Sequence, residues 1–355
     1  MSALPEDKRA REFCERLLHW FDGHGRRDLP WSGSQDPYRI WVSEIMLQQT
    51  QVATVGDYYK RFIERFPSVT DLASADIDEV LHLWTGLGYY ARARNLHKAA
   101  RIIVDERGGR FPTDIEQMVT LPGIGRSTAG AILAFAYRQR HPILDGNVKR
   151  VLARVHRVSG WPGKREVEKR LWDMADAYTP ASRVDDYTQA IMDLGAGVCL
   201  RRSPRCDLCP VADLCEAQKH GDTESYPERA PRKAKPVKAT GMLLIRNERG
   251  EVLLQQRPPT GIWGGLWGLP ECDAGMTAAT RDFESLGLIL ETGPPAGVVR
   301  HSFTHFDLDI TPIPARVRAS LEAVMDNEKL VWYNPEQPRA LGLAAPIKRL
   351  IETLS

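Results

Sequence analysis

The stretch LPGIGRSTAGAILAFAYRQRHPILDGNVKRVLARV, residues 121–155, decides the fold that we expect for this chain. Its first five residues, 121–125, lie between two helical patterns, and the second pattern, residues 126–138, is rich in Ala and Gly. Gly123 and Gly125 permit a turn so tight that backbone N–H groups and a helix N-terminus converge on one point. Such a point suits a phosphate oxygen, although the same turn is also common as a plain connection. The pattern therefore predicts a helical hairpin, with phosphate binding as one of two interpretations.

Polar residues mark helix starts on both sides of this hairpin. Thr113 and Glu116 have the spacing of a capping box, which predicts a helix start before the turn. Asp145 precedes an amphipathic pattern and is a good N-cap, and a capped carboxylate is fixed in place and stays ionised. The helix that follows is predicted to bury an apolar stripe and to carry a basic stripe. The two stripes are Val148, Val151, Leu152 and Val155, and Arg150, Arg154 and Arg157.

Glu44 lies upstream in SEIMLQQTQV, residues 43–52, on the polar face of a predicted helix. A lone Glu on such a face is normally solvated. The neighbouring Gln and Thr side chains favour a second interpretation, because such a cluster can hydrogen-bond unpaired base edges. Further along, Tyr89 in LGYY is interpreted either as a core residue or as a group that stacks on bases.

Four of the six cysteines lie close together, at Cys199, Cys206, Cys209 and Cys215. This crowding favours metal binding over disulfides. Zinc sites usually pair two short C-x₂₋₄-C knuckles, whereas this C-x₆-C-x₂-C-x₅-C pattern has one. We therefore expect an iron–sulfur cluster, with zinc as the alternative. Arginines inside the loop are interpreted either as solvated charges or as a phosphate grip. They are Arg201, Arg202 and Arg205.

The composition is that of a globular protein with a mildly basic front part. Of 355 residues, 43% are hydrophobic and 26% are charged, and the net charge is +2. Residues 1–238 carry 37 Lys and Arg against 32 Asp and Glu, whereas residues 239–355 carry 11 against 14. This distribution suits a polyanionic partner for the front part. No apolar run is long enough for a membrane span, and the charged N-terminus lacks the apolar core of a secretion signal. We therefore expect a cytoplasmic protein, nucleoid-associated if bacterial, without a membrane partner.

The sequence pattern predicts two domains. Residues 1–220 are predicted to be helical, and residues 221–238, which are rich in charges and proline, to be a linker. In residues 239–355 the pattern changes, because strand-like runs at 239–245 and 251–256 flank a turn and HSFTHFDLDI continues the alternation. We expect an all-α body followed by a smaller α+β domain.

Taken together, SEIMLQQTQV, GLGYYARARN, LPGIGRSTAGAI, LDGNVKRV and the four cysteines resemble the helix-hairpin-helix glycosylase superfamily, most closely its adenine-removing members. The resemblance covers nearly the whole chain. It implies an all-α helix-hairpin-helix body with a [4Fe–4S] cluster loop at residues 199–215, followed by a Nudix-like domain. It also implies a base-excision-repair enzyme that hydrolyses the N-glycosidic bond of adenine opposite 8-oxoguanine or guanine in duplex DNA. We expect the enzyme to be a monomer.

The same resemblance implies roles for individual residues. Glu44 is expected to be the general acid, and Asp145 the carboxylate that supports the cationic sugar. The residues expected to line the adenine pocket are Arg27, Leu29, Trp31 and Gln189. Those expected to contact or wedge the DNA are Gln49, Thr50, Tyr89, Gly123, Gly125, Ser127 and Asn147. The loop expected to read the oxidised guanine is Phe303, Thr304 and His305.

Two departures from related patterns refine this expectation. Strand-cleaving members such as endonuclease III have a lysine just after the hairpin, where this chain has Ser127, and a serine cannot form a Schiff base. Lys149 is a nearby amine that can trap an abasic aldehyde adventitiously. The stretch corresponding to a Nudix box, residues 270–288, retains mainly Glu284 of the carboxylates that would hold magnesium, which favours recognition over nucleotide hydrolysis.

Three alternative functions are less consistent with these residues. A bifunctional glycosylase/lyase is disfavoured by Ser127 and by the C-terminal domain. A non-catalytic DNA-damage binding protein needs neither Glu44 nor Asp145. An active Nudix hydrolase fused to a DNA-binding body is disfavoured by the missing carboxylates.

Overall fold

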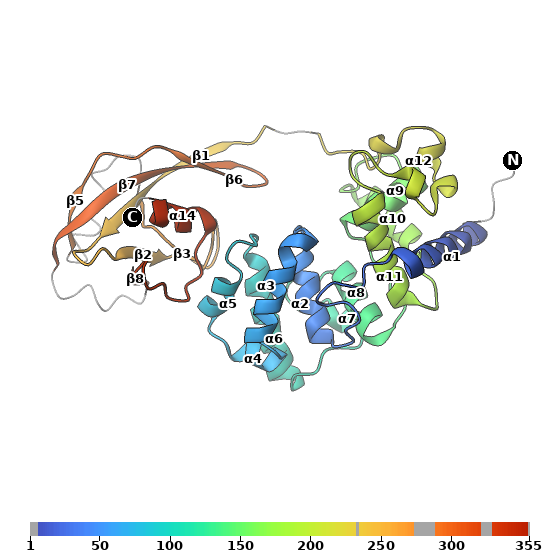
Figure 1. Ribbon diagram of the computed structural model, residues 1–355, viewed down its shortest axis with the longest axis horizontal. Coiled ribbons are helices and arrows are strands. Elements are labelled where there is room, and N and C mark those ends of the chain that lie inside the picture. Colours follow the sequence, from blue (N-terminus) through green and yellow to red (C-terminus); the bar gives the residue numbers. More distant parts are fainter. Residues whose placement is uncertain (1–5, 232–233, 273–287, 321–328, 354–355) are drawn as a thin grey trace. The chain divides into compact units, whose positions relative to one another are not determined.

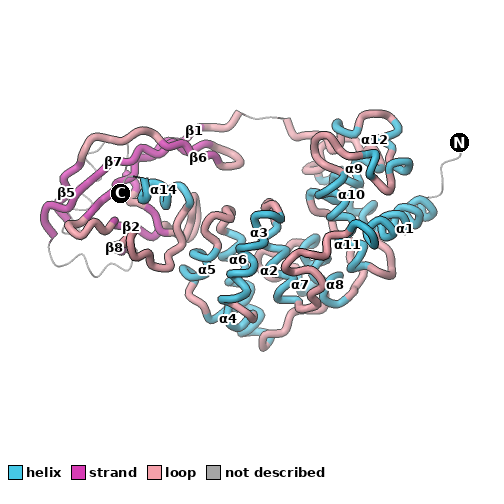
Figure 2. The backbone as a smooth tube through the Cα atoms, viewed as in Figure 1, coloured by secondary structure: helices cyan, strands magenta, loops and turns pink. Residues whose placement is uncertain are grey.

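The computed structural model describes residues 6–231, 234–272, 288–320 and 329–353. The chain divides into two compact units, one formed by Met1–Ser74 with Asn95–Arg232 and the other by Ala75–Arg94 with Lys233–Ser355. Figure 2 shows that the first unit is built from helices and that strands dominate the second. None of the helices in the described ranges is both long enough and apolar enough to cross a membrane.

The first unit is a bundle of short helices joined by tight connections (Figure 1). Its α-helices are α1 (Glu6–His24), α2 (Pro37–Leu47), α3 (Val52–Arg65), α4 (Val69–Ser74), most of α6 (Ala91–Arg107), α7 (Ile115–Met118), α8 (Arg126–Tyr137), α9 (Gly146–Val155), α10 (Arg165–Tyr178), α11 (Val184–Asp193) and α12 (Glu216–Lys219). A π-helical turn, η1 (Leu194–Val198), continues α11. Three 3₁₀ turns follow it, η2 (Cys206–Leu208), η3 (Ala212–Leu214) and η4 (Thr223–Ser225).

The expected hairpin forms between α7 and α8. Gly123 has φ +81°, and a Cβ there would lie 2.9 Å from the Cβ of Asn95, so both the turn and the close approach require glycine. Gly125 is the N-cap of α8. The predicted cap of the preceding helix is wrong by one residue. Asp114, not Thr113, is the N-cap of α7, and its side chain accepts a hydrogen bond from the backbone N–H of Gln117.

Helix α9 packs against α10, α11, α12 and η1. The predicted apolar stripe is buried in one hydrophobic core with residues of α1, α10 and α11. Gly195 lets η1 approach closely, because a Cβ there would lie 2.5 Å from the Cβ of Asn147. The N-terminus of α9 is therefore held against the segment that leads into the cysteine loop.

The second unit contains an eight-stranded sheet together with α5 (Ile77–Leu83) and α14 (Ala345–Thr353). The main strand order is β3-β2-β1-β7-β5, with β4 on β1, β6 on β7 and β8 on β2. The strands are β1 (Val237–Arg246), β2 (Val252–Gln256), β3 (Trp267–Gly268), β4 (Glu271–Cys272), β5 (Leu288–Thr292), β6 (Val299–Ser302), β7 (Asp307–Ser320) and β8 (Leu330–Tyr333). β1 and β7 run parallel and the other pairs antiparallel.

This sheet confirms the expected change from helical to strand-forming sequence in the C-terminal part of the chain. β1 is central and buries five consecutive residues, 241–245, as a strand with both faces covered does. The stretch HSFTHFDLDI is not one strand, because the backbone N–H of Phe303 bonds to the carbonyl of Phe306 at 2.9 Å and closes a turn between β6 and β7. Glu284 and most of the stretch that corresponds to a Nudix box lie outside the described residues.

Candidate active site and cysteine loop

Two carboxyl groups from distant parts of the chain meet in one cavity of the first unit. Glu44 comes from α2, which packs against α8, and Asp145 caps α9. Both line a cavity of about 310 Å³, which is large enough for a small organic group. A second cavity of about 350 Å³ shares Trp31, Glu44 and Gln189 with the first. Other predicted residues on these walls are Arg27, Leu29, Thr50, Ser127 and Asn147.

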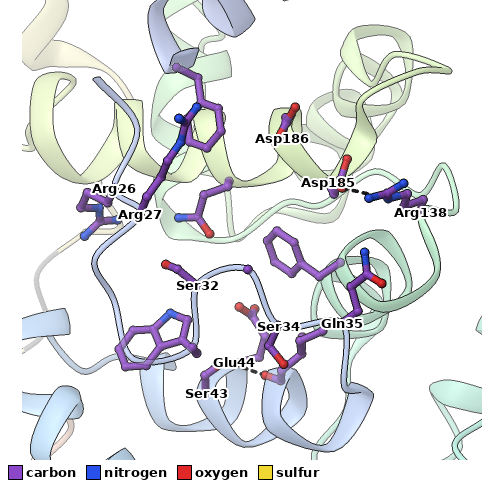
Figure 3. A pocket seen from close by; sticks show the side chains of 16 residues that line it. Arg26, Arg27, Ser32, Ser34, Gln35, Ser43, Glu44, Arg138, Asp185 and Asp186 are labelled. Atoms are coloured by element: carbon purple, nitrogen blue, oxygen red, sulfur yellow. Dashed lines mark hydrogen bonds and ion pairs between the residues drawn. The ribbon is translucent and has the colours of Figure 1, made fainter. Parts of the chain in front are cut away.

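Figure 3 shows the second of these cavities. Ser43 and Glu44 lie on one side of it, on α2, and Asp185 and Asp186 lie on another side, on α11. Arg138 forms an ion pair with Asp185, with 3.3 Å between Nε and Oδ2. The cavity is therefore bounded by both acidic and basic groups, as a site for a polar ligand is.

Local structure fixes Asp145 at the end of the helix. Its Oδ1 accepts a hydrogen bond of 2.8 Å from the backbone N–H of Val148, so the predicted N-cap forms. The preceding residue is tied to α8, because the backbone N–H of Leu144 donates to Ser127 Oγ at 3.0 Å. Gly130 of α8 allows this approach, since a Cβ there would lie 2.8 Å from the carbonyl oxygen of Pro142. The small residue at this position of α8 therefore lets the segment that leads to Asp145 pack closely against the helix.

The environments of the two carboxyl groups differ. Burial, and then the charge of Asp145, raise the pKa of Glu44 to about 8. Burial also raises the pKa of Asp145, but hydrogen bonds from Val148 and Asn147 and the charge of Arg150 oppose this shift. The expectation that the cap alone keeps Asp145 ionised is therefore incomplete. Burial therefore favours the protonated form of Glu44 near neutral pH, whereas the hydrogen bonds and the N-terminus of α9 favour the charged form of Asp145.

An ion pair between Arg26 and the buried carboxylate of Asp193 lies at the pocket wall and was not expected from the sequence. Asp193 accepts hydrogen bonds from the backbone and guanidinium of Arg26 and from the side chain of Gln189. Arg26 also lines both cavities. Its neighbour Arg27 lies over the ring of Phe21, 5.7 Å from the centroid, and lines the second cavity.

The four clustered cysteines line a common cavity with apolar walls. Cys199, Cys206, Cys209 and Cys215 are free thiols, and Val151, Val155 and Leu194 are among the residues beside them. In the described part of the chain, no three or more His, Cys, Asp or Glu side chains are placed to hold a single metal ion. Four sulfurs around one cavity supply the ligand set that an iron–sulfur cluster requires.

Two arginines of the predicted basic stripe, Arg150 and Arg154, face this loop, whereas Arg157 is exposed and pairs with Asp222. Arg154 is 2% exposed and donates to Cys199 Sγ at 3.2 Å and to the carbonyl of Leu200 at 2.7 Å. Its other hydrogen bonds are to the carbonyls of Arg201, Thr223 and Tyr226. Arg150 donates to the carbonyl of Cys199 at 2.7 Å and to Asn147 Oδ1 at 2.9 Å. These contacts join the N-terminus of α9 to the cysteine loop, whereas Arg201, Arg202 and Arg205 remain exposed.

In the second unit, the structure brings together two positions predicted from different parts of the sequence. Tyr89, at φ 48° and 48% exposed, has its hydroxyl 3.2 Å from Thr304 Oγ1. Phe303 packs among aromatic rings, with its centroid 4.6 Å from His301 and 4.5 Å from Phe306. Thr304 and His305 are exposed at the turn. The aromatic residue therefore anchors the turn, and the two polar residues face outward.

Gln49 and Lys149 also lie apart from the cavities. Gln49 is exposed at φ 58° between α2 and α3. Lys149 donates to Glu168 Oε1 at 2.7 Å and does not line either cavity.

Comparisons with known proteins agree with this architecture. Residues 42–176 match the HhH-GPD superfamily of base excision DNA repair proteins, residues 199–215 the iron–sulfur binding domain of endonuclease III, and residues 241–353 a NUDIX domain. A solved thermostable thymine-DNA glycosylase is similar, with a TM-score of 0.53 and 28% identity, over 60% of this chain and 98% of its own. Endonuclease III in a non-covalent DNA complex has the same fold, with a TM-score of 0.53 and 22% identity, over 62% of this chain and 99% of its own.

The helical fold, the hairpin and the cysteine loop thus define a base-excision-repair glycosylase of the helix-hairpin-helix superfamily. The adenine DNA glycosylase of Buchnera aphidicola subsp. Acyrthosiphon pisum is 37% identical over 340 residues, which are 96% of this chain and 97% of that protein. The adenine DNA glycosylase of Rattus norvegicus is 33% identical over 95% of this chain and 77% of that protein. The chain belongs to the adenine DNA glycosylase family, whose members cleave N-glycosidic bonds and carry a [4Fe–4S] cluster.

Proposed function

We propose that this glycosylase binds duplex DNA as a monomer and hydrolyses adenine from mispairs with 8-oxoguanine or guanine, leaving an abasic site. The observation that carries the proposal is the placement of Glu44 and Asp145 in one cavity, where burial raises the pKa of Glu44 to about 8. An acid that holds its proton and a fixed carboxylate are what the departure of a base from its sugar requires.

The chemistry follows from these two groups. An adenine turned out of the duplex, at a cost of about a few kcal/mol, enters the cavity beside Glu44. Glu44 donates its proton to N7, which makes adenine a better leaving group, and Asp145 stabilises the positive charge that develops on the sugar. The Glu44 carboxylate then accepts a proton from the attacking water, which restores the acid. This hydrolysis moves no electrons, so a cluster held by the four cysteines supplies structural order to the DNA-binding loop.

The contacts of Ser127 and Lys149 support a reaction that stops at the abasic site. Ser127 Oγ accepts from the backbone of Leu144, so this position anchors the approach to Asp145 and offers no amine. Lys149 is engaged by Glu168. We therefore propose that strand cleavage is not part of the activity.

We further propose that the C-terminal domain reads the base opposite adenine. Adenine is a normal base, so the signal of damage must come from the other strand. Thr304 and His305 are exposed polar groups on an anchored turn, and Tyr89 lies beside Thr304 as a candidate for stacking on bases. In this view the domain recognises a damaged base and does not hydrolyse nucleotides.

The proposal also includes the DNA contacts expected of individual residues and the domain boundaries. The hairpin at Gly123 and Gly125 would bind backbone phosphate, and Gln49 and Tyr89 would wedge the duplex. Thr50 and Asn147 would lie beside the extruded nucleotide, as their positions on the wall of the Glu44 cavity support. The proposed domains are residues 1–220 and 239–355, joined by a linker at 221–238.

The test compares excision of adenine opposite 8-oxoguanine and opposite guanine. Deletion at the linker is unsuitable, because Ala75–Arg94 belongs to the same compact unit as the C-terminal domain. We therefore choose Thr304→Val with His305→Ala, and Thr292→Val on β5 as the matched control. We expect the preference for 8-oxoguanine in single-turnover rate and in binding to fall by about tenfold in the double variant alone, as loss of a polar base contact should cause. An unchanged preference would show that the turn has only a structural role.

A further inference from the structure

The carboxylate of Asp193, at the end of α11, is surrounded by N–H donors. The side chain is 2% exposed, and its Oδ2 accepts from the backbone N–H of Arg26 at 2.9 Å. Its Oδ1 accepts from Arg26 Nε at 2.9 Å, Arg26 Nη2 at 2.6 Å and Gln189 Nε2 at 2.8 Å. A carboxylate has about four acceptor positions, so these four donors occupy its hydrogen-bonding capacity.

This arrangement dictates which end of the Gln189 amide faces Asp193. The guanidinium of Arg26 keeps its charge and can only donate, so the paired carboxylate can only accept. Gln189 must therefore turn its NH₂ group toward Asp193. Its Oε1 remains available to the two cavities that Gln189 lines.

Three other polar groups of this pocket are donors, whereas the carboxylates of Asp185 and Asp186 line its α11 side. Arg27 and the indole N–H of Trp31 can only donate, and burial favours the protonated form of Glu44 near neutral pH. Adenine presents ring nitrogens that accept and an exocyclic 6-amine that donates. These donors and the amide oxygen of Gln189 complement adenine, because the 6-amine can donate to that oxygen. A 6-oxopurine would instead place its carbonyl oxygen against the oxygen of Gln189, and two acceptors cannot hydrogen-bond.

We propose that Asp193 is a positioning residue that fixes Gln189 with its amide oxygen toward the base, so that the enzyme selects 6-aminopurines over 6-oxopurines. This inference rests on the proposed function. It adds the origin of base selectivity, which lies in an ion pair between Arg26, in the segment after α1, and Asp193 at the end of α11.

The experiment measures single-turnover excision of three bases placed in the same duplex: adenine, unsubstituted purine and hypoxanthine. In Asp193→Asn the new asparagine can present its NH₂ group to Gln189. The amide of Gln189 can then turn around, so that its NH₂ group and not its oxygen faces the base. We expect the ratio of adenine to purine rate constants to fall by about tenfold, and the ratio of adenine to hypoxanthine to fall at least as much. General damage to the fold lowers all three rates together, so unchanged ratios would overturn the proposal. The matched control is Asp173→Asn on α10, whose carboxylate pairs with Lys169 at the surface, and its ratios should equal those of the wild type.

A second variant tests the acceptor itself, even if Asp193→Asn fails to fold. Gln189→Met keeps the length of the side chain and removes the acceptor, so it should lower the adenine-to-purine ratio to a similar degree. In the Gln189→Met background, Asp193→Asn should cause no further change in that ratio, because it acts through Gln189. A normal ratio in Gln189→Met, or an additional change in the double variant, would contradict the proposal. Absence of adenine release by the wild type would instead overturn the proposed function, and this inference with it.

Discussion

Replacing Glu44 with glutamine should remove the acid and also relieve a cost to stability. Burial and the charge of Asp145 raise the pKa of Glu44 from 4.5 to about 8. Between these pH values the folded state holds a proton that the unfolded state releases. The free energy of unfolding of the wild type therefore falls as pH rises through this window, and Glu44→Gln, which does not titrate, lacks this contribution.

The size of this effect follows from the pKa. At about 1.4 kcal/mol per pH unit, the contribution of Glu44 between pH 5 and pH 8 has an upper limit of about 4 kcal/mol. The side chain faces an open cavity, and solvation there reduces the effect to about 1–3 kcal/mol. Stability of Glu44→Gln relative to the wild type should increase by this amount from pH 5 to pH 8.

The catalytic consequence has the opposite sign. Excision by Glu44→Gln should fall by roughly 10²-fold or more, while affinity for the duplex is retained. In the wild type, the excision rate constant should be level at neutral pH and fall as pH passes about 8, where Glu44 loses its proton.

Urea unfolding at pH 5 and pH 8, combined with single-turnover excision at each pH, measures both effects. Glu64→Gln replaces an exposed carboxylate on α3 and is the matched control, for which neither quantity should change. The reasoning is refuted if the stability difference between Glu44→Gln and the wild type is the same at both pH values, or if the variant excises adenine at a near-normal rate.

Three further substitutions have predicted outcomes. Asp145→Asn should keep the N-cap and change the free energy of unfolding by less than about 1 kcal/mol, because Asn caps helices as well as Asp. The variant should bind DNA but fail to excise adenine, and rapid excision would show that the wrong carboxylate was chosen. Ser127→Lys should gain β-elimination, measured as strand breaks without alkali and as borohydride trapping, neither of which the wild type should show. Arg154→Met should leave the Cys199 sulfur and several carbonyls without their donor, each at about 1–3 kcal/mol. Iron retained after gel filtration with a chelator should fall by at least about half, whereas Arg157→Met, which breaks a surface pair with Asp222, should retain iron; equal retention in both would contradict this role.

Features that depend on neighbouring residues could be predicted from the sequence. The hairpin, the apolar stripe of α9, the N-cap at Asp145 and the four cysteines depend on local spacing, and the structure has all of them. Where two neighbouring polar residues can both cap a helix, the sequence pattern does not determine which of them does so. Thr113 and Asp114 both suit an N-cap, and the backbone conformation at Asp114 decides between them.

Features that depend on long-range packing could not be predicted. Arg26 and Asp193 are 167 residues apart, and no spacing rule connects them. The hydroxyls of Tyr89 and Thr304 meet across 215 residues. The basic stripe of α9 was visible in the sequence, but only the packing of the cysteine loop against α9 shows that Arg154 is buried beside a thiol.

The central claim is that this enzyme removes adenine from a damaged mispair and leaves the strand intact. The most direct measurement incubates the purified protein in excess with a duplex that contains one adenine opposite 8-oxoguanine, and follows free adenine by mass spectrometry alongside strand integrity. We predict stoichiometric release of adenine, a break at that position only after alkali, and slower release opposite guanine. Release of 8-oxoguanine in place of adenine, or cleavage of the strand without alkali, would contradict the account.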